Sequence, residues 1–402
     1  MQHGPTRATQ PEAVAVVVGQ LGQGGTERQL YHFLAHCDFA RWVPTVYVSG
    51  ELGFWEIPIR ELGIPVVLLK GRPLDKMRQL RAACIARKTR CLFSWSSYTN
   101  VFALALAGLG VRSIGSFRNA LFADLPTGLR GLWSWMSLAG ISVAVCNSRE
   151  TQEQLTHRLG AKRRVVYVPN AVEIFPPDRM ARWRTEWRRR LDLRDDAVLV
   201  LGVGRLAPQK RFDRFIDTIA RVGRHSRVQA AIAGKDLGCL DELKRQVARL
   251  GLDDRVRFLG SVPDARELIC AADIFLLSSD HEGMPNVVLE AMAASVPCVA
   301  TRVNGVGDII QNGVTGVIAE SDPEELSRHV LRLAKNAGLR RKIGALARAW
   351  VEQKFQPKSV TSQLWTLCAA ASDADTKEWI GHATRNLRRP GFPTRGRHSF
   401  DG

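Results

Sequence analysis

The fold of this chain is decided by a stretch that begins Asp273-Ile-Phe-Leu-Leu277, continues through Glu282-Gly-Met-Pro-Asn286 and ends in Val287-Val-Leu-Glu-Ala-Met-Ala-Ala294. The first run is short and apolar, which is typical of a buried strand in a parallel sheet. Gly283 allows a positive φ and Pro285 suits the first turn of a helix, so a strand-to-helix turn is expected. Backbone N–H groups at such a helix start are unpaired and partly positive, which predicts docking of an anionic phosphate.

Two carboxylates lie around this turn, Glu282 in the loop and Glu290 about two turns into the helix. For an isolated pair of glutamates, an exposed helix face is the alternative. The residues downstream favour a binding site instead, because a second β-type run at 297–301 is followed by glycine-containing turns at 304–308 and 312–316. We expect Glu282 to face a sugar and Glu290 to reach the ribose diol of a bound nucleotide.

The segment 276–316 resembles the donor-binding signature of retaining glycosyltransferases of family 4, whose two-domain fold is called GT-B, and the resemblance is densest between Val256 and Gly316. The resemblance extends from about Val14 to about Leu367. Further motifs follow in the family's order: the glycine-rich loop Gly24-Gly25-Thr26-Glu27-Arg28, the hinge Val168-Pro169-Asn170-Ala171-Val172, and Gly202-Val-Gly204-Arg205-Leu206 followed by Lys210.

The resemblance implies a set of site residues. It assigns catalytic roles to Arg205, Lys210 and Glu282, and donor binding to Gly24, Gly25, Gly283, Met284, Pro285, Asn286 and Glu290. The residue pattern supports the two cations independently, because the β-type run 198–203 precedes Arg205 and a helical apolar period follows Lys210. The carboxyl ends of parallel strands are where ligands bind, and two cations suit the two charges of a diphosphate. Solvated surface is the alternative for any single Arg or Lys in so basic a chain.

Some first-domain residues keep two interpretations. Thr26 and Gln29 have capping-box spacing, and the glycine loop before them is either a tight turn or a donor or acceptor contact. Arg118 and Asn119 stand where many relatives have a catalytic-site His; they are expected to contact acceptor or donor, with a structural salt bridge and turn as the alternative.

Alternating β-type runs and amphipathic helices predict an α/β protein of two Rossmann-like domains with parallel sheets facing a central cleft. The expected boundaries are 13–172 for the acceptor-side domain, with a crossover helix at about 357–380 returning to it. The nucleotide-sugar domain is expected at 173–356, and a disordered basic tail at 381–402.

The composition of the chain limits the classes of partner that it is expected to bind. The net charge is +18, and the first 172 residues hold 20 Lys/Arg against 10 Asp/Glu, which calls for an anionic partner or surface. Five basic residues between 78 and 90, with Trp133 and Trp135, form a candidate contact for anionic lipid headgroups, with an ordinary basic surface as the alternative. The eight cysteines are scattered, so reduced thiols in a cytoplasmic protein, peripheral on the inner face of the cell membrane, are expected.

The resemblance implies a retaining, metal-independent transferase that moves a hexose-type sugar from a UDP- or GDP-sugar to a cell-envelope glycan or lipid-linked acceptor. No cofactor is expected, and the Asp373-Ala-Asp375 pair lies away from any strand end, which argues against metal binding there. The alternatives are a sugar-nucleotide epimerase of the same fold, a silent binding module, and a basic protein that binds nucleic acid. The last is disfavoured because no nucleic-acid motif occurs and the strongest motif presents carboxylates.

Overall fold

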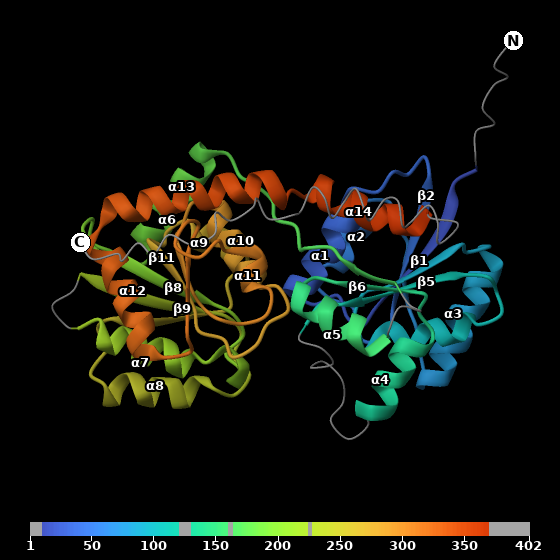
Figure 1. Cartoon of the computed structure of the whole chain (residues 1–402), viewed down its shortest axis with the longest axis horizontal. Coiled ribbons are helices and arrows are strands. Elements are labelled where there is room, and N and C mark those ends of the chain that lie inside the picture. The colour runs from blue at the N-terminus through green and yellow to red at the C-terminus, as the bar shows by residue number, and fades with distance from the viewer. Residues whose placement is uncertain (1–9, 120–129, 160–163, 224–226, 370–402) are drawn as a thin grey trace, which may run out of the picture.

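The computed structural model describes residues 10–119, 130–159, 164–223 and 227–369. In this part of the chain, two parallel sheets stand side by side, each covered by helices on both faces (Figure 1). The expected tail at 381–402, the far end of the crossover helix and the Asp373–Asp375 pair lie outside the described residues. The prediction of an α/β fold with two parallel sheets is confirmed.

The first sheet has the order β3-β2-β1-β4-β5-β6-β7. Its strands are β1 (Glu12–Val18), β2 (Trp42–Val48), β3 (Val66–Leu68), β4 (Cys91–Ser94), β5 (Arg112–Phe117), β6 (Val143–Cys146) and β7 (Arg164–Tyr167). Its helices are α1 (Gly25–Ala35), α2 (Glu56–Glu61), α3 (Pro73–Ala86), the 3-10 helix η1 (Thr99–Leu106), α4 (Arg130–Ala139) and α5 (Arg149–Leu159).

The second sheet has the order β10-β9-β8-β11-β12-β13. Its strands are β8 (Val198–Val203), β9 (Val228–Ala233), β10 (Val256–Gly260), β11 (Ile274–Leu277), β12 (Cys298–Thr301) and β13 (Val317–Ala319). Its helical elements are α6 (Pro177–Arg190), η4 (Pro208–Lys210), α7 (Phe212–Arg221), α8 (Leu240–Arg249), α9 (Ala265–Ile269), α10 (Asn286–Ala293), α11 (Val306–Ile309), α12 (Pro323–Lys335) and α13 (Ala337–Lys354).

Continuous apolar runs form the central strands because both sheet faces are buried. In β1, Val14, Val16 and Val18 join one core, while Ala15 and Val17 join the core on the opposite face. In β8 the alternation is the same, with Leu199 and Leu201 on one side and Val198 and Val200 on the other. Each sheet is therefore the middle layer of its own three-layer domain.

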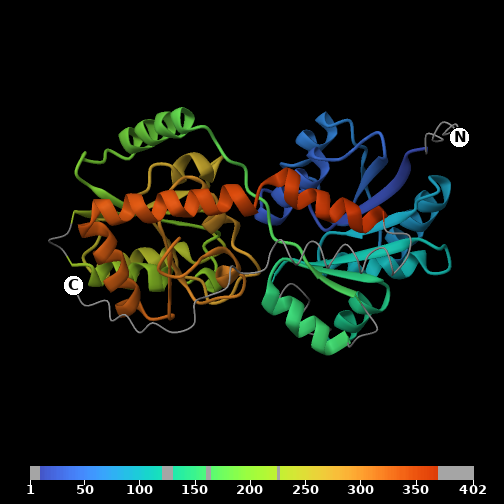
Figure 2. The same cartoon turned by 45° about the horizontal axis from the view of Figure 1, so that its top comes forward.

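Within the described residues, the chain passes between the domains twice. The first crossing follows β7, and the second joins α13 to the last described helix, α14 (Pro357–Ala369), which lies against the first domain (Figure 2). The two crossings touch, because the Val172 N–H donates to the Phe355 carbonyl at 2.8 Å. Helix α14 is part of the first core: the Trp365 ring stacks on Phe33 with centroids 4.1 Å apart, and its Nε1 donates to the Phe33 carbonyl at 2.9 Å.

All eight cysteines are free thiols in the structure. Within the described residues, no helix combines the length and the apolar character needed to cross a bilayer.

Candidate active site

The candidate site lies where both sheets reverse their strand order. In each sheet the order changes direction between two strands, β1 and β4 in the first and β8 and β11 in the second. At such a point, neighbouring crossovers leave on opposite faces and open a crevice at the carboxyl ends of the strands. The glycine loop follows β1, Arg205 and Lys210 follow β8, and the loop from Glu282 to Asn286 follows β11. The predicted site residues therefore gather at the two switch points.

Lys210 and Glu282 form a largely buried ion pair. Lys210 Nζ lies 2.6 Å from Glu282 Oε1, and Ser279 Oγ donates to the same oxygen at 2.7 Å. The backbone holds this lysine in place, since Ser278 Oγ donates to the Lys210 carbonyl at 2.9 Å. The sequence predicted one residue for phosphate and the other for sugar. In the structure they are adjacent, so a ligand phosphate bound at the lysine would place its attached group beside the carboxylate.

Arg205 is exposed at the end of β8, and its charge acts on a residue of the first domain. Burial raises the pKa of the Glu27 carboxyl, while the Arg205 guanidinium opposes this rise. Glu27 is in the first turn of α1 and only 8% exposed. Glu27 belongs to the glycine loop, and its place in the sequence predicted no role for it.

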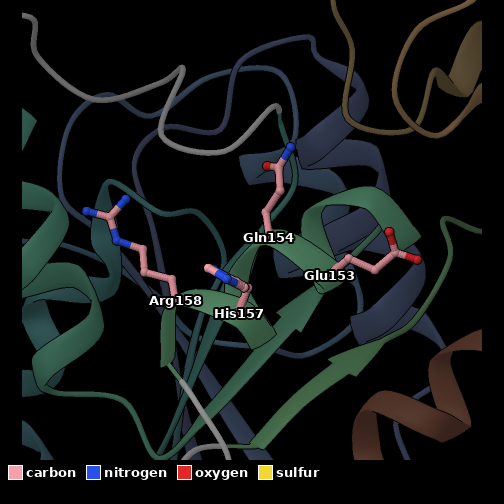
Figure 3. A pocket seen from close by; sticks show the side chains of 4 residues that line it. All are labelled: Glu153, Gln154, His157 and Arg158. Carbon is pink, nitrogen blue, oxygen red and sulfur yellow. The ribbon is translucent and has the colours of Figure 1, made fainter.

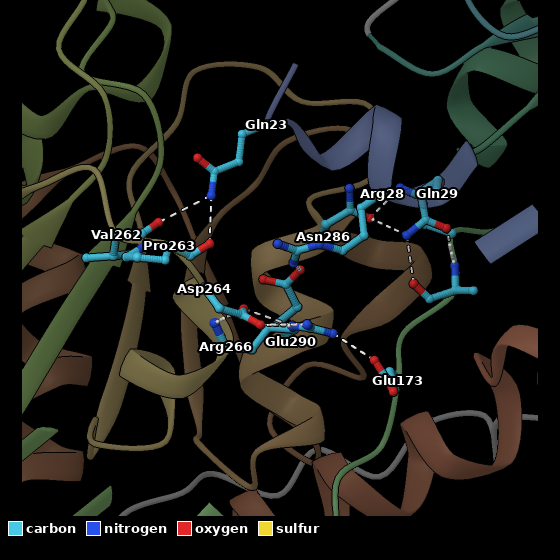
Figure 4. A network of polar contacts seen from close by, with 12 residues as sticks. Gln23, Arg28, Gln29, Glu173, Val262, Pro263, Asp264, Arg266, Asn286 and Glu290 are labelled. Atoms are coloured by element: carbon cyan, nitrogen blue, oxygen red, sulfur yellow. Dashed lines mark hydrogen bonds and ion pairs between the residues drawn. The ribbon is translucent and has the colours of Figure 1, made fainter. Parts of the chain in front are cut away.

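Glu290 meets the first domain directly. Its Oε1 accepts from Arg28 Nη1, and both side chains are largely buried (Figure 4). Burial raises the pKa of the Glu290 carboxyl, the charges of Arg28 and Arg266 lower it, and Asp264 raises it. Arg266 in turn holds the Asp264 carboxylate at 2.6 Å and Glu173 at 2.8 Å. The residue expected at the ribose diol thus belongs to a charged network that joins the domains.

A hydrogen-bonded hinge lies beside this network. Gln29 and Ala171 exchange two bonds of 2.7 Å, from Gln29 Nε2 to the Ala171 carbonyl and from the Ala171 N–H to Gln29 Oε1. Asn170 Nδ2 donates to Asn286 Oδ1 at 2.9 Å and to the Met284 carbonyl at 3.1 Å. Two predicted donor-binding residues, Asn286 and Met284, are therefore also held by the hinge.

The capping box predicted for α1 is wrong. Helix α1 starts at Gly25 with Gly24 as its N-cap, and no side chain caps it. The reason is tertiary: the Gln29 amide bonds to the hinge rather than to the helix start. Thr26 is already inside the first turn, and its carbonyl accepts from Trp95 Nε1 at 2.9 Å.

Two glycines allow the domains to touch. A Cβ on Gly25 would stand 2.3 Å from Asn286 Nδ2, and one on Gly283 would stand 2.4 Å from the Arg118 carbonyl oxygen. The expected positive φ of Gly283 is wrong, because its φ is not among the positive ones. The glycine is required by close approach of another backbone instead. Pro285 is likewise the N-cap of α10 rather than its first residue.

Arg118 and Asn119 follow β5 and face this junction. The Arg118 guanidinium lies over the Trp95 ring, with Cζ 3.9 Å from the centroid, and Nη1 donates to Asn170 Oδ1 at 3.3 Å. Arg118 has no ion pair within the described residues. Burial lowers the pKa of Arg118 to about 9.

No cluster of three or more His, Cys, Asp or Glu that could hold a metal occurs in the described ranges. A hollow on α5 is lined by Glu153, Gln154, His157 and Arg158 (Figure 3). These four residues belong to one helix and include none of the predicted site residues, so the hollow does not change the site assignment.

The fold and the paired switch points define the class of protein, which is the GT-B class of two Rossmann-like domains. Solved structures agree on the fold: the complex of Anabaena Alr3699/HepE with UDP and glucose has a TM-score of 0.78 at 20% identity and covers 92% of this chain and 100% of that chain.

The sequence of the second domain matches a known family. Residues 184–350 match the family of glycosyl transferases group 1, which confirms the predicted likeness to glycosyltransferases for this part of the chain. The D-inositol 3-phosphate glycosyltransferase of Geodermatophilus obscurus is 36% identical over 225 residues, which are 50% of this chain and 49% of that protein. The lipopolysaccharide core biosynthesis glycosyltransferase LpsE of Rhizobium meliloti is 28% identical over 260 residues, 64% of this chain and 71% of that protein. The chain thus aligns with about half of one relative and about seven tenths of the other.

Proposed function

We propose that this chain is a retaining, metal-independent glycosyltransferase of family 4. It moves a hexose-type sugar from a UDP- or GDP-sugar to a cell-envelope glycan or lipid-linked acceptor. The observation that carries the proposal is the meeting of two switch points: Arg205 and the Lys210–Glu282 pair stand at one, and α1 with Arg28 stands at the other. A group bound at the edge of one sheet would therefore face a second substrate bound at the edge of the other sheet.

The proposed chemistry breaks the bond between the anomeric carbon and the diphosphate oxygen. Arg205, Lys210 and the start of α10 face the negative charge that develops on the leaving diphosphate, which is electrostatic stabilisation by fixed groups. Glu282, next to Lys210, orients the sugar hydroxyls and stands near the developing positive charge of the ring. The acceptor oxygen attacks the anomeric carbon from the same face, and its proton passes to a phosphate oxygen of the leaving group.

The relatives support a sugar-nucleotide donor more than any particular acceptor. The solved relative binds UDP and glucose, while the aligned proteins are named for D-inositol 3-phosphate and for the lipopolysaccharide core. Because the names of the two aligned proteins indicate different acceptors, the proposed acceptor class is argued from the basic charge of the first domain. We place the protein in the cytoplasm, at the inner face of the cell membrane, where α3 and α4 would meet anionic headgroups.

A nucleotide panel tests the proposal. UDP- and GDP-sugars should raise the melting temperature of the protein, whereas single-stranded nucleic acid should not. A ligand at 100 times its dissociation constant stabilises a protein by about 2.7 kcal/mol. Lys210→Ala, Arg205→Ala and Glu290→Ala should each weaken donor binding or turnover at least tenfold and leave the far-UV spectrum unchanged. Equal transfer rates in all three variants would refute the site assignment.

The product identifies the reaction. A new glycosidic bond with the donor's anomeric configuration supports a retaining transferase, an altered sugar nucleotide without transfer indicates an epimerase, and binding without conversion indicates a silent module. Transfer that persists in excess chelator supports metal independence, and transfer that needs an added divalent ion contradicts it.

A further inference from the structure

Arg118 is a half-buried cation with no counter-ion in the described part of the first domain. Its guanidinium has one long hydrogen bond, 3.3 Å from Nη1 to Asn170 Oδ1, and its Nε is enclosed without a hydrogen-bond partner in the described residues. The fully buried Arg214 and Arg255 are satisfied, and Arg28, whose Nε is also enclosed without a hydrogen-bond partner in the described residues, has the Glu290 carboxylate as its counter-ion. Arg214 binds the Asp280 carboxylate at 2.7 Å and the Ser278 carbonyl at 2.7 Å, and Arg255 binds backbone carbonyls through three nitrogens.

Such a charge is costly. Buried charges in proteins are normally paired. A buried donor without a partner loses its hydrogen bonds to water and gains no hydrogen bond within the protein. Stacking on Trp95 offsets part of the desolvation free energy of Arg118, because a guanidinium over an aromatic face gains a cation–π attraction. The ring does not supply a negative charge, and burial lowers the pKa of Arg118 to about 9.

The position of Arg118 is that of a ligand contact. It follows β5, its carbonyl lies against Gly283 of the donor loop, and Trp95 beneath it is tied to the start of α1 by the bond to Thr26. The residue is only partly enclosed, so a ligand can reach the guanidinium. Donor phosphates already have Arg205 and Lys210 in the second domain, whereas Arg118 belongs to the first.

We infer that Arg118 is an acceptor-binding residue that takes an anionic group, a phosphoryl or carboxylate, of the second substrate. The planar fork of its guanidinium matches two oxygens of such a group at once. The inference rests on the proposed function, since it assumes that the donor occupies the second domain and the acceptor the first. It adds that the acceptor carries its negative charge close to the reacting sugar.

Inorganic phosphate is the probe. Titrations are run at constant ionic strength with the nucleotide site saturated by UDP or GDP, so that phosphate cannot enter the diphosphate site. Arg118→Gln keeps a donor for Asn170 and removes the charge; it should weaken phosphate binding at least tenfold and leave nucleotide affinity within twofold. Arg118→Lys should recover most of the binding. Arg81→Gln is the matched control, because Arg81 is also basic and bonds to the carbonyls of Ala105 and Ala107.

The inference is overturned if phosphate binds wild type and Arg118→Gln equally, or does not bind wild type. It is also overturned if Arg118→Gln loses nucleotide affinity instead, because the cation would then serve the donor. Should Arg118→Gln fail to fold, Arg118→His replaces it: phosphate binding should appear as pH falls below about 6.5, where imidazole is charged, and be absent at pH 8. If the wild-type protein binds no nucleotide, the proposed function is refuted. A phosphate titration without nucleotide then still tests whether Arg118 binds an anionic group.

Discussion

Arg28 and Glu290 carry opposite charges from different domains into one buried contact. A ribose diol donates two hydrogen bonds, so a carboxylate that binds it must be ionised. Burial works against ionisation by raising the pKa of Glu290, and Asp264 does the same, while Arg28 and Arg266 oppose them. We therefore propose a positioning role for Arg28: it would keep Glu290 charged and hold one of its oxygens, which would leave the other oxygen for the proposed ribose contact.

The pH dependence of donor binding tests this role. In Arg28→Met the pKa of Glu290 should rise further, so donor affinity should be lost at a higher pH than in wild type as the solution is acidified. At pH values below the pKa of Glu290, each unit by which this pKa rises should weaken donor binding about tenfold. Affinities should converge at alkaline pH, where Glu290 is ionised in both. Arg28→Lys should restore the wild-type profile.

Isothermal titration between pH 5 and 9 measures the effect. Arg60→Met is the control, because Arg60 forms a more exposed ion pair with Glu56 on α2. A pH profile of Arg28→Met that is parallel to wild type, only weaker throughout, would mean that Arg28 merely supports the domain contact.

At the scale of elements, the glycine contacts fix how closely α1 and the donor loop approach. Gly283→Ala would push a methyl group against the Arg118 backbone, which cannot move without shifting β5 or the whole domain. Gly25→Ala meets only the Asn286 amide, although Asn170 and Gln29 hold that amide in place. We expect Gly283→Ala to reduce turnover most, by at least tenfold, and Gly25→Ala to reduce it less.

Small-angle scattering, combined with measurements of donor turnover, distinguishes a displacement of the domains from simple unfolding. Both variants should show a larger separation of the domains while the secondary structure stays intact. Gly307→Ala is the matched control, since a Cβ there has no atom within 4 Å and its φ is not positive. A Gly283→Ala protein with wild-type turnover and scattering would contradict the close-contact argument.

The elements themselves were largely predictable, while the contacts between them were not. The apolar run at 273–277 and the helix formers after Pro285 have local signals, and β11 and α10 begin within one residue of the expected places. Glu27 and Arg28 carried no such signal, because their partners Arg205 and Glu290 are far along the chain and in another domain. Gln29 was misread for the same reason, since its spacing fits a cap and its amide bonds to a hinge 142 residues away.

At the scale of the whole molecule, the proposed membrane contact would use the face formed by α3 and α4. Helices α3 and α4 both pack on η1, and they expose the apolar side chains Leu74, Ile85, Leu132 and Trp135. Exposed basic residues on α3 and directly after it are Arg78, Arg87, Lys88 and Arg90. Trp133 is anchored beneath, stacked on Tyr98 with its Nε1 bonded to the Tyr98 carbonyl at 3.2 Å. Exposed aromatic and apolar side chains amid basic ones suit the headgroup layer of an anionic bilayer.

Vesicle flotation tests this orientation. Wild type should float with vesicles that contain anionic lipid and stay behind with neutral ones, and the bound fraction should fall as salt is raised. Replacing Arg78, Arg87 and Lys88 by Gln should remove most of the binding, since each basic residue near the surface contributes about 1 kcal/mol. Trp135→Ser should weaken it without altering its salt dependence. The matched control replaces Arg182, Arg189 and Arg190 of α6, which removes the same charge from the other domain. Equal loss in both triple variants would mean that net charge alone, rather than the α3–α4 face, brings this protein to the membrane.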